Sequence, residues 1–203
     1  MKVFLGKASV KNGMWMYFLQ FFNAVIPLMT LPYITRILGA EQYGIFSIAL
    51  NIVTYLQVLV EYGFGMSATR KIALAEKKDL SKLFSSVLYA GSFLLFVSLM
   101  ISLSYNFVHK SNTQLTISLA ILLICLLGYS VQMDWVFQGK QEMKYISIVN
   151  IISRTISVIG IFAFVRTAED LFLYCFLYSV SPLLSGFVGL FIAKKKYKLN
   201  LRK

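Results

Sequence analysis

The chain alternates between long apolar stretches and short polar connections. The apolar stretches cover residues 14–35, 44–65, 84–105, 115–137, 146–165 and 171–193. Each contains the roughly 20 residues that an α-helix needs to cross a hydrocarbon core of about 30 Å. The pattern predicts an all-α fold: a polytopic integral membrane bundle with six transmembrane helices. No Pro- or Gly-rich linker interrupts it, so residues 1–203 are expected to form a single bundle.

Basic residues are distributed unevenly between the two sides of this expected bundle. Sixteen of the twenty Lys and Arg residues lie in the two tails and in the second and fourth connections. The remaining connections contain only Arg36, Lys110 and Arg166, and Arg154 lies inside the fifth stretch. Because Lys and Arg accumulate in cytoplasmic loops, both termini are predicted to be cytoplasmic.

The overall composition agrees with a membrane protein. The chain is 58% hydrophobic, its mean hydropathy is +0.72 and its formal net charge is +12. In a soluble protein this charge would suggest nucleic acid as a partner. In a membrane protein the inside loops face anionic lipids, so we expect anionic membrane lipids and no nucleic acid as partners.

Three of the apolar stretches carry polar residues on one helical face. The polar residues recur at intervals of three, four or seven: Gln20, Asn23, Pro27 and Thr30; Ser47, Asn51, Thr54 and Glu61; and Ser147, Asn150, Arg154 and Ser157. Residues at these intervals lie on one face of an α-helix. Lipid cannot solvate such faces, so we expect all three to surround one hydrated cavity.

Arg154 is the charged residue deepest in these stretches. It lies eight residues beyond the start of its stretch, which is about 12 Å of helix. An arginine at the centre of a membrane helix costs about 2.5–3.5 kcal/mol on insertion scales. This cost predicts a functional role. The alternatives are that the side chain extends to the cytoplasmic interface, or that it pairs with Glu61 or Asp134.

Two further patterns concern packing and position in the membrane. Ser181, Ser185 and Gly189 have the spacing of small residues that allows two helices to approach closely. Many aromatic residues, Tyr43 among them, lie near predicted span ends, where they are expected to anchor the helices at the membrane interface.

Soluble-type catalytic chemistry is not recognisable in the sequence. The one histidine, His109, lies in a short outer loop, and no phosphate-binding loop motif occurs. Glu169 and Asp170 are adjacent in a tight outer turn and do not form an acid–base pair. The sequence therefore predicts no metal, no cofactor and no enzyme activity.

Three motifs resemble those of a known family. They are PYITRILGAEQYG at residues 32–44, GFGMSATR at residues 63–70 and DWVFQGKQEMK at residues 134–144. They are similar to motifs of bacterial polysaccharide flippases, the Wzx-type members of the multidrug/oligosaccharidyl-lipid/polysaccharide exporter superfamily. The resemblance runs along essentially the whole chain.

The resemblance implies a flippase of the bacterial inner membrane. Such proteins move undecaprenyl-diphosphate-linked oligosaccharide repeat units across this membrane for O-antigen, capsule or exopolysaccharide assembly. They have two lobes of six helices around a central cationic cavity and work by alternating access. Six helices make only the first lobe. The chain is then either a truncated product, which we favour, or a partner of a second six-helix lobe, with a polysaccharide polymerase as another possible partner.

These observations suggest roles for individual residues. We expect Arg154, with Asn150 and Asn23, to contact the diphosphate or the sugar. Arg36 would contact the head group as it leaves or hold an outer gate. Glu61 and Asp134 are candidates for ion coupling, although solvation at the interface also explains them. Two other functions stay open: a drug or metabolite exporter of the same superfamily, and a non-transporting scaffold of glycan assembly.

Overall fold

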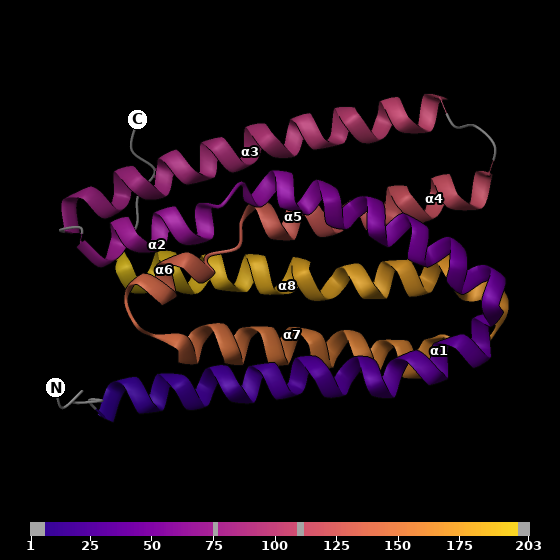
Figure 1. Cartoon of the computed structure of the whole chain (residues 1–203), viewed down its shortest axis with the longest axis horizontal. Helices are drawn as coiled ribbons and strands as arrows, with labels where there is room; N and C mark the ends of the chain where they lie inside the picture. The colour runs from indigo at the N-terminus through magenta and orange to yellow at the C-terminus, as the bar shows by residue number, and fades with distance from the viewer. Residues whose placement is uncertain (1–6, 75–76, 109–111, 199–203) are drawn as a thin grey trace, which may run out of the picture.

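The computed structural model describes residues 7–74, 77–108 and 112–198, and all the regular structure in these residues is helical. This confirms the all-α prediction. The elements in chain order are α1 (Lys7–Glu61), α2 (Phe64–Leu74), α3 (Lys77–Val108), α4 (Thr113–Leu122), α5 (Ile124–Ser130), α6 (Asp134–Gly139), α7 (Met143–Phe164), the 3-10 helix η1 (Ala168–Asp170) and α8 (Leu171–Tyr197) (Figure 1).

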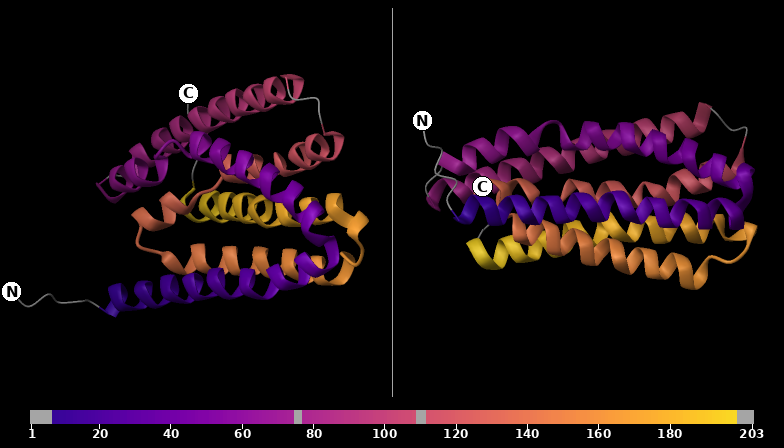
Figure 2. Two further views of the ribbon diagram at one scale, coloured as in Figure 1. Left: turned by 45° about the vertical axis from the view of Figure 1, so that its right-hand side comes forward. Right: turned by 60° about the horizontal axis from the view of Figure 1, so that its bottom comes forward.

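Helix α1 reverses its direction at Gly39. The backbone there has φ 75° and ψ 170°, a conformation that glycine adopts readily and other residues adopt rarely. Figures 1 and 2 show the chain running along the bundle before this residue and back again after it. The first half of α1 (residues 7–38) therefore contains the first predicted apolar stretch, and the second half (residues 40–61) contains most of the second.

Several helices have the length and composition of membrane spans. Within the described residues five stretches qualify: Val10–Ala73, Leu80–Ser104, Thr113–Gly139, Met143–Phe164 and Ala168–Tyr197. The first of them contains both halves of α1 together with most of α2. Each predicted apolar stretch overlaps one of the five, so the positions of the apolar helices agree with the sequence pattern.

The first half of α1 lies parallel to α7, although the two are far apart in sequence. Near one end the Ser147 hydroxyl donates to the carbonyl oxygen of Trp15 at 2.8 Å. Near the other end the Tyr33 hydroxyl donates to the carbonyl oxygen of Val165 at 2.9 Å. These two bonds fix the register of the pair, which places Asn23 opposite Arg154.

The second half of α1 packs on the other side of the bundle. Its buried apolar residues recur at intervals of three and four: Ile45, Ala49, Val53, Leu56 and Val60. This face joins a core that includes Leu119 and Leu122 of α4 and Leu126 of α5. Because one face of the helix is committed to this core, the opposite face points away from it.

The start of α1 and the end of α8 lie at the same end of the bundle. The Asn12 amide donates to the carbonyl oxygen of Gln141 at 2.6 Å, and Glu142 pairs with Lys196 and accepts a bond from the Tyr197 hydroxyl. We call this the inner end. The Gly39 reversal and η1 lie at the other end, which we call the outer end (Figure 1).

Helices α5 and α8 approach closely at two glycines. A Cβ atom added at Gly128 would lie 2.2 Å from the carbonyl oxygen of Pro182, and one added at Gly186 would lie 2.2 Å from that of Gly128. A Cβ atom at Gly189 would meet nothing within 4 Å. Helix α8 therefore packs closely on another helix, as predicted, but the contact is made by Pro182 and Gly186. Gly189 takes no part in it.

This difference gives a matched test of packing. We expect Gly128→Ala to lower the free energy of unfolding by about 1–3 kcal/mol, because the added methyl group overlaps backbone atoms of α8. Gly189→Ala should be neutral or stabilising by up to about 1 kcal/mol, since alanine favours the helix. Detergent unfolding followed by circular dichroism measures both. Equal destabilisation by the two variants would contradict the close contact.

Candidate functional site

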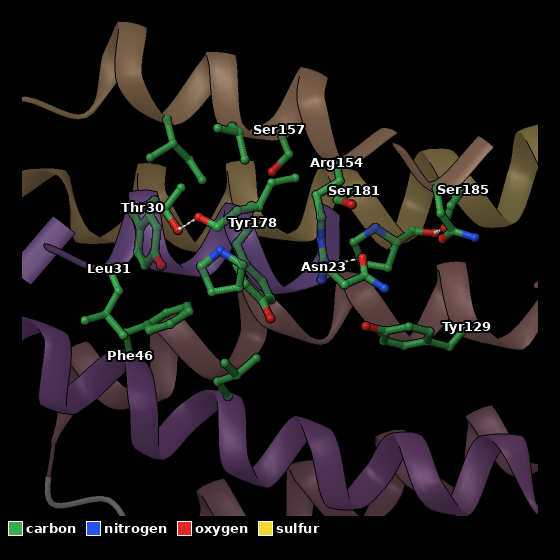
Figure 3. Close-up of a pocket in the computed structure, with 18 of the residues that line it drawn as sticks. Asn23, Thr30, Leu31, Phe46, Tyr129, Arg154, Ser157, Tyr178, Ser181 and Ser185 are labelled. Carbon is green, nitrogen blue, oxygen red and sulfur yellow. Dashed lines mark hydrogen bonds between the residues drawn. The ribbon is translucent and has the colours of Figure 1, made fainter. Parts of the chain in front are cut away.

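A partly open cavity of about 350 Å³ lies between α1, α7 and α8. Both halves of α1 line it, and Tyr129 of α5 and Gln132, which follows α5, complete the wall. Figure 3 shows Asn23, Arg154 and Ser181 near its middle. The cavity is therefore formed by residues from widely separated parts of the sequence.

Arg154 is the positively charged residue of this cavity. Its Nη1 group donates a hydrogen bond to the Oδ1 atom of Asn23 across the α1–α7 contact (Figure 3). The guanidinium has five N–H donors, so this bond leaves others free to face the cavity. Within the described residues the recorded ion pair is Lys196–Glu142, and Arg154 has no carboxylate partner among them.

Asn150 joins Asn23 and Arg154 in the same cavity. It lies one turn before Arg154 on α7, where its Nδ2 group donates to the carbonyl oxygen of Ile146 at 2.9 Å. The structure thus brings together three of the four residues that the sequence predicts to bind substrate. The fourth, Arg36, is exposed toward the outer end of α1 and does not line the cavity.

Glu61 and Asp134 line a separate cavity of about 230 Å³. Gln57 donates to Glu61, and Gln132 donates to Asp134, both at 2.7 Å. Neither carboxylate contacts Arg154 directly, but Tyr129 and Gln132 line both cavities. Among the described residues no three His, Cys, Asp or Glu side chains are grouped as metal ligands, and His109 lies outside those residues.

The prediction that three polar faces surround one cavity is wrong for the second face. Asn23, Pro27 and Thr30 of α1 and Asn150, Arg154 and Ser157 of α7 line the cavity. In the second half of α1, Ser47, Asn51 and Thr54 do not line it. The apolar face of that helix packs on α4 and α5 and so turns its polar face outward. Thr54 satisfies its hydroxyl by donating to the carbonyl oxygen of Leu50 at 2.8 Å.

Helix α8 contributes cavity residues that the sequence did not predict as such, although Ser181 and Ser185 were predicted to allow close helix packing. Tyr174, Tyr178, Ser181 and Ser185 all line the cavity. Their intervals of four, three and four place them on one helical face, and this spacing is the signal that could have identified them. Tyr43, predicted as an interface anchor, also lines the cavity.

The fold and the cavity together define a class of protein. A bundle of apolar helices that surrounds an arginine, asparagines and tyrosines is an integral membrane protein with a polar cavity. A sequence model described as "Polysaccharide biosynthesis protein" matches residues 9–203. The chain belongs to this family.

Two curated relatives share about the same part of the chain. Both are named "Putative O-antigen transporter". The protein from Escherichia coli (strain K12) is 30% identical over 184 residues, which cover 90% of this chain and 44% of the relative. The protein from Shigella dysenteriae is 27% identical over 186 residues, covering 91% of this chain and 47% of the relative. The chain thus spans about half the length of these relatives. No solved structure matches it.

The Arg154–Asn23 bond can be measured by a double-mutant cycle. We expect Asn23→Ala and Arg154→Ala to show a coupling energy of about 0.5–3 kcal/mol in unfolding experiments, because they share one hydrogen bond. Asn51→Ala is the control, since Asn51 is exposed like Asn23 but does not line the cavity, and it should change stability by less than about 0.5 kcal/mol. Additive effects of the first two substitutions would show that the bond does not hold α1 against α7.

Proposed function

We propose that this protein takes part in moving a lipid-linked oligosaccharide, carried on undecaprenyl diphosphate, across the bacterial inner membrane. The observation that carries this proposal is Arg154, a cation without a carboxylate partner in the described residues that faces the cavity. Membership of the polysaccharide biosynthesis family and the names of the two relatives support it. The protein is then a transporter and not an enzyme.

The physical basis is the cost of moving a diphosphate through lipid. Its negative charges cannot enter hydrocarbon unaided, whereas a cavity that holds a cation offers compensating hydrogen bonds. Arginine matches phosphate oxygens with two parallel N–H donors. Asn23 already holds one end of the guanidinium, so the remaining donors are oriented toward the ligand. Asn150 supplies a neighbouring amide group.

The other predicted residues have outlying roles in this proposal. Arg36 would contact the head group at the outer end, outside the cavity. Glu61 and Asp134 would bind a proton or a cation whose movement drives transport. Their cavity shares Tyr129 and Gln132 with the Arg154 cavity, and Asn150 of the Arg154 cavity also interacts with the Asp134 carboxylate, so these three side chains would link ion and substrate.

The proposal includes a membrane topology and partners. The chain crosses the inner membrane six times with both termini in the cytoplasm, and a second six-helix lobe completes the transport pathway. The reversal at Gly39 supports separate crossings by the two halves of α1. Anionic lipids would contact the basic inner end, and a polysaccharide polymerase would receive the product.

Binding of a sugar-free polyprenyl diphosphate to the chain in lipid nanodiscs tests the role of Arg154. We expect Arg154→Ala to raise the Kd about tenfold to a hundredfold, since charge-assisted bonds contribute about 1.5–3 kcal/mol. Arg154→Lys should be intermediate because it keeps the charge but loses the paired donors. Arg166→Ala, which removes an exposed arginine near η1, is the matched control.

The same variants separate the rival functions. Unchanged binding by Arg154→Ala would reject the proposed site. A drug exporter would instead change the drug sensitivity of cells and would not restore glycan display to a strain without a flippase. A scaffold would keep its effect on glycan assembly after Arg154 is neutralised.

Reporter fusions test the topology. Alkaline phosphatase folds only where disulfides form, outside the cytoplasm. We expect fusions after Glu169 to be active and fusions after Lys144 to be inactive. Fusions after Arg36 should also be active, because the proposal places the Gly39 reversal outside. Active fusions after Lys144, together with inactive fusions after Arg36 and Glu169, would contradict the proposed orientation.

A further inference from the structure

The outer part of the cavity is lined by an aromatic wall, which consists of Tyr43, Phe46, Tyr174 and Tyr178. The ring centre of Phe46 lies 4.5 Å from that of Tyr174 and 5.4 Å from that of Tyr178. The Tyr43 ring lies 5.9 Å from Phe46. Two of these residues come from the second half of α1 and two from α8, so the wall exists only in the folded bundle.

The tyrosine hydroxyls of this wall are available for a ligand. Within the described part of the chain, Tyr43, Tyr174 and Tyr178 make no hydrogen bond through their hydroxyls, and none of these groups is completely buried. Tyr174 is nevertheless only 6% exposed. Tyrosine hydroxyls in protein interiors normally find a partner. Here the partner has to come from the contents of the cavity, either water or a bound molecule.

The aromatic wall and Arg154 occupy different levels of the same cavity. Ser157 of α7 donates a hydrogen bond to the carbonyl oxygen of Leu177 on α8, so Tyr178 lies about one helical turn beyond Arg154 and Tyr174 about two turns beyond it. Figure 3 shows Phe46, Tyr178 and Thr30 on one side of Arg154 and Asn23, with Tyr129 and Ser185 on the other. The cavity therefore has a cationic middle and an uncharged, aromatic and hydroxyl-bearing outer part.

These two kinds of group suit two parts of one ligand. A guanidinium suits a diphosphate. A pyranose ring has C–H faces that pack on aromatic rings and hydroxyl edges that exchange hydrogen bonds with tyrosine hydroxyls. A cavity of about 350 Å³ is within the usual size of small-molecule sites. Because the wall carries no charge, it favours a neutral group there.

We propose that the aromatic wall binds the sugar ring that is attached directly to the diphosphate held by Arg154. This inference rests on the proposed function and extends it. It makes the preferred ligand a glycan-bearing lipid diphosphate and not the bare lipid diphosphate. The ligand lies with its diphosphate beside Asn23 and Arg154 and its glycan toward the outer end of the bundle.

The experiment compares two lipids on the full chain in nanodiscs. One is a polyprenyl diphosphate without sugar, and the other carries a single hexose on the diphosphate. We expect the wild type to bind the sugar-bearing lipid at least about tenfold more tightly, which corresponds to about 1.4 kcal/mol. Native mass spectrometry or radioligand binding measures both Kd values.

Substitutions at Tyr178 assign this preference to the wall. Tyr178→Leu removes the ring and should abolish most of the tenfold preference, whereas Tyr178→Phe keeps the ring and should lose only part of it. Both should weaken binding of the sugar-free lipid less than binding of the sugar-bearing lipid. Tyr55→Leu is the control, because Tyr55 is 78% exposed on the second half of α1 and does not line the cavity. If Tyr178→Leu unfolds at a lower temperature, the nearly isosteric Tyr178→Phe decides the result.

The possible outcomes separate this inference from the proposed function. Equal binding of the two lipids by the wild type, or an equal weakening of both by Tyr178→Leu and Tyr178→Phe, would show that the wall is only packing. Failure of the wild type to bind either lipid would overturn the proposed function as well. A hydrophobic cation such as tetraphenylphosphonium that binds and depends on the Tyr178 ring, with no preference for the sugar, would assign the wall to cation–π recognition instead.

Discussion

An arginine inside a bundle of apolar helices has to find its hydrogen-bond partners within the protein, because lipid supplies none. In this molecule the requirement determines how α1 and α7 meet. Asn23 accepts a bond from Arg154, and bonds from Ser147 to Trp15 and from Tyr33 to Val165 hold the same pair of helices on either side of it. The parallel alignment of two segments distant in sequence thus follows the need to solvate one cation.

Glycines position the remaining walls around that cation. The reversal at Gly39 turns the second half of α1 back along the bundle, so that Phe46 packs against Tyr178 in the aromatic wall. The contact between Gly128 and Gly186 brings the backbones of α5 and α8 together. A side chain at either of these two positions would separate the helices and change the width of the cavity.

The sequence predicts those features that depend on local periodicity. Apolar stretches of sufficient length become helices, and the spacing of Asn150 and Arg154 places them on one face of α7. The direction in which a face points depends on competition with other faces of the same helix. Asn51 and Thr54 were predicted to face the cavity. The apolar face that includes Ile45 packs against α4 and α5 instead, so these two polar residues point away from that contact.

Aromatic residues are hard to assign from sequence for a different reason. Tyr174 and Tyr178 have the right spacing to line a cavity, yet the same spacing suits packing in a core. The structure shows that the rings of Tyr174 and Tyr178 line a cavity, because Tyr43 and Phe46 of α1 line the same cavity. The contact between Gly128 and Gly186 likewise depends on two helices meeting, which no single segment encodes.

The partition between the two cavities is only one layer of side chains thick. Tyr129 and Gln132 each face both spaces, and Gln132 lies in the short non-helical segment between α5 and α6, where the backbone is least constrained by helical hydrogen bonds. These two side chains belong to the walls of both cavities. A movement of Tyr129 or Gln132 therefore changes the shape of the space around Arg154 and of the space around Glu61 and Asp134 at the same time.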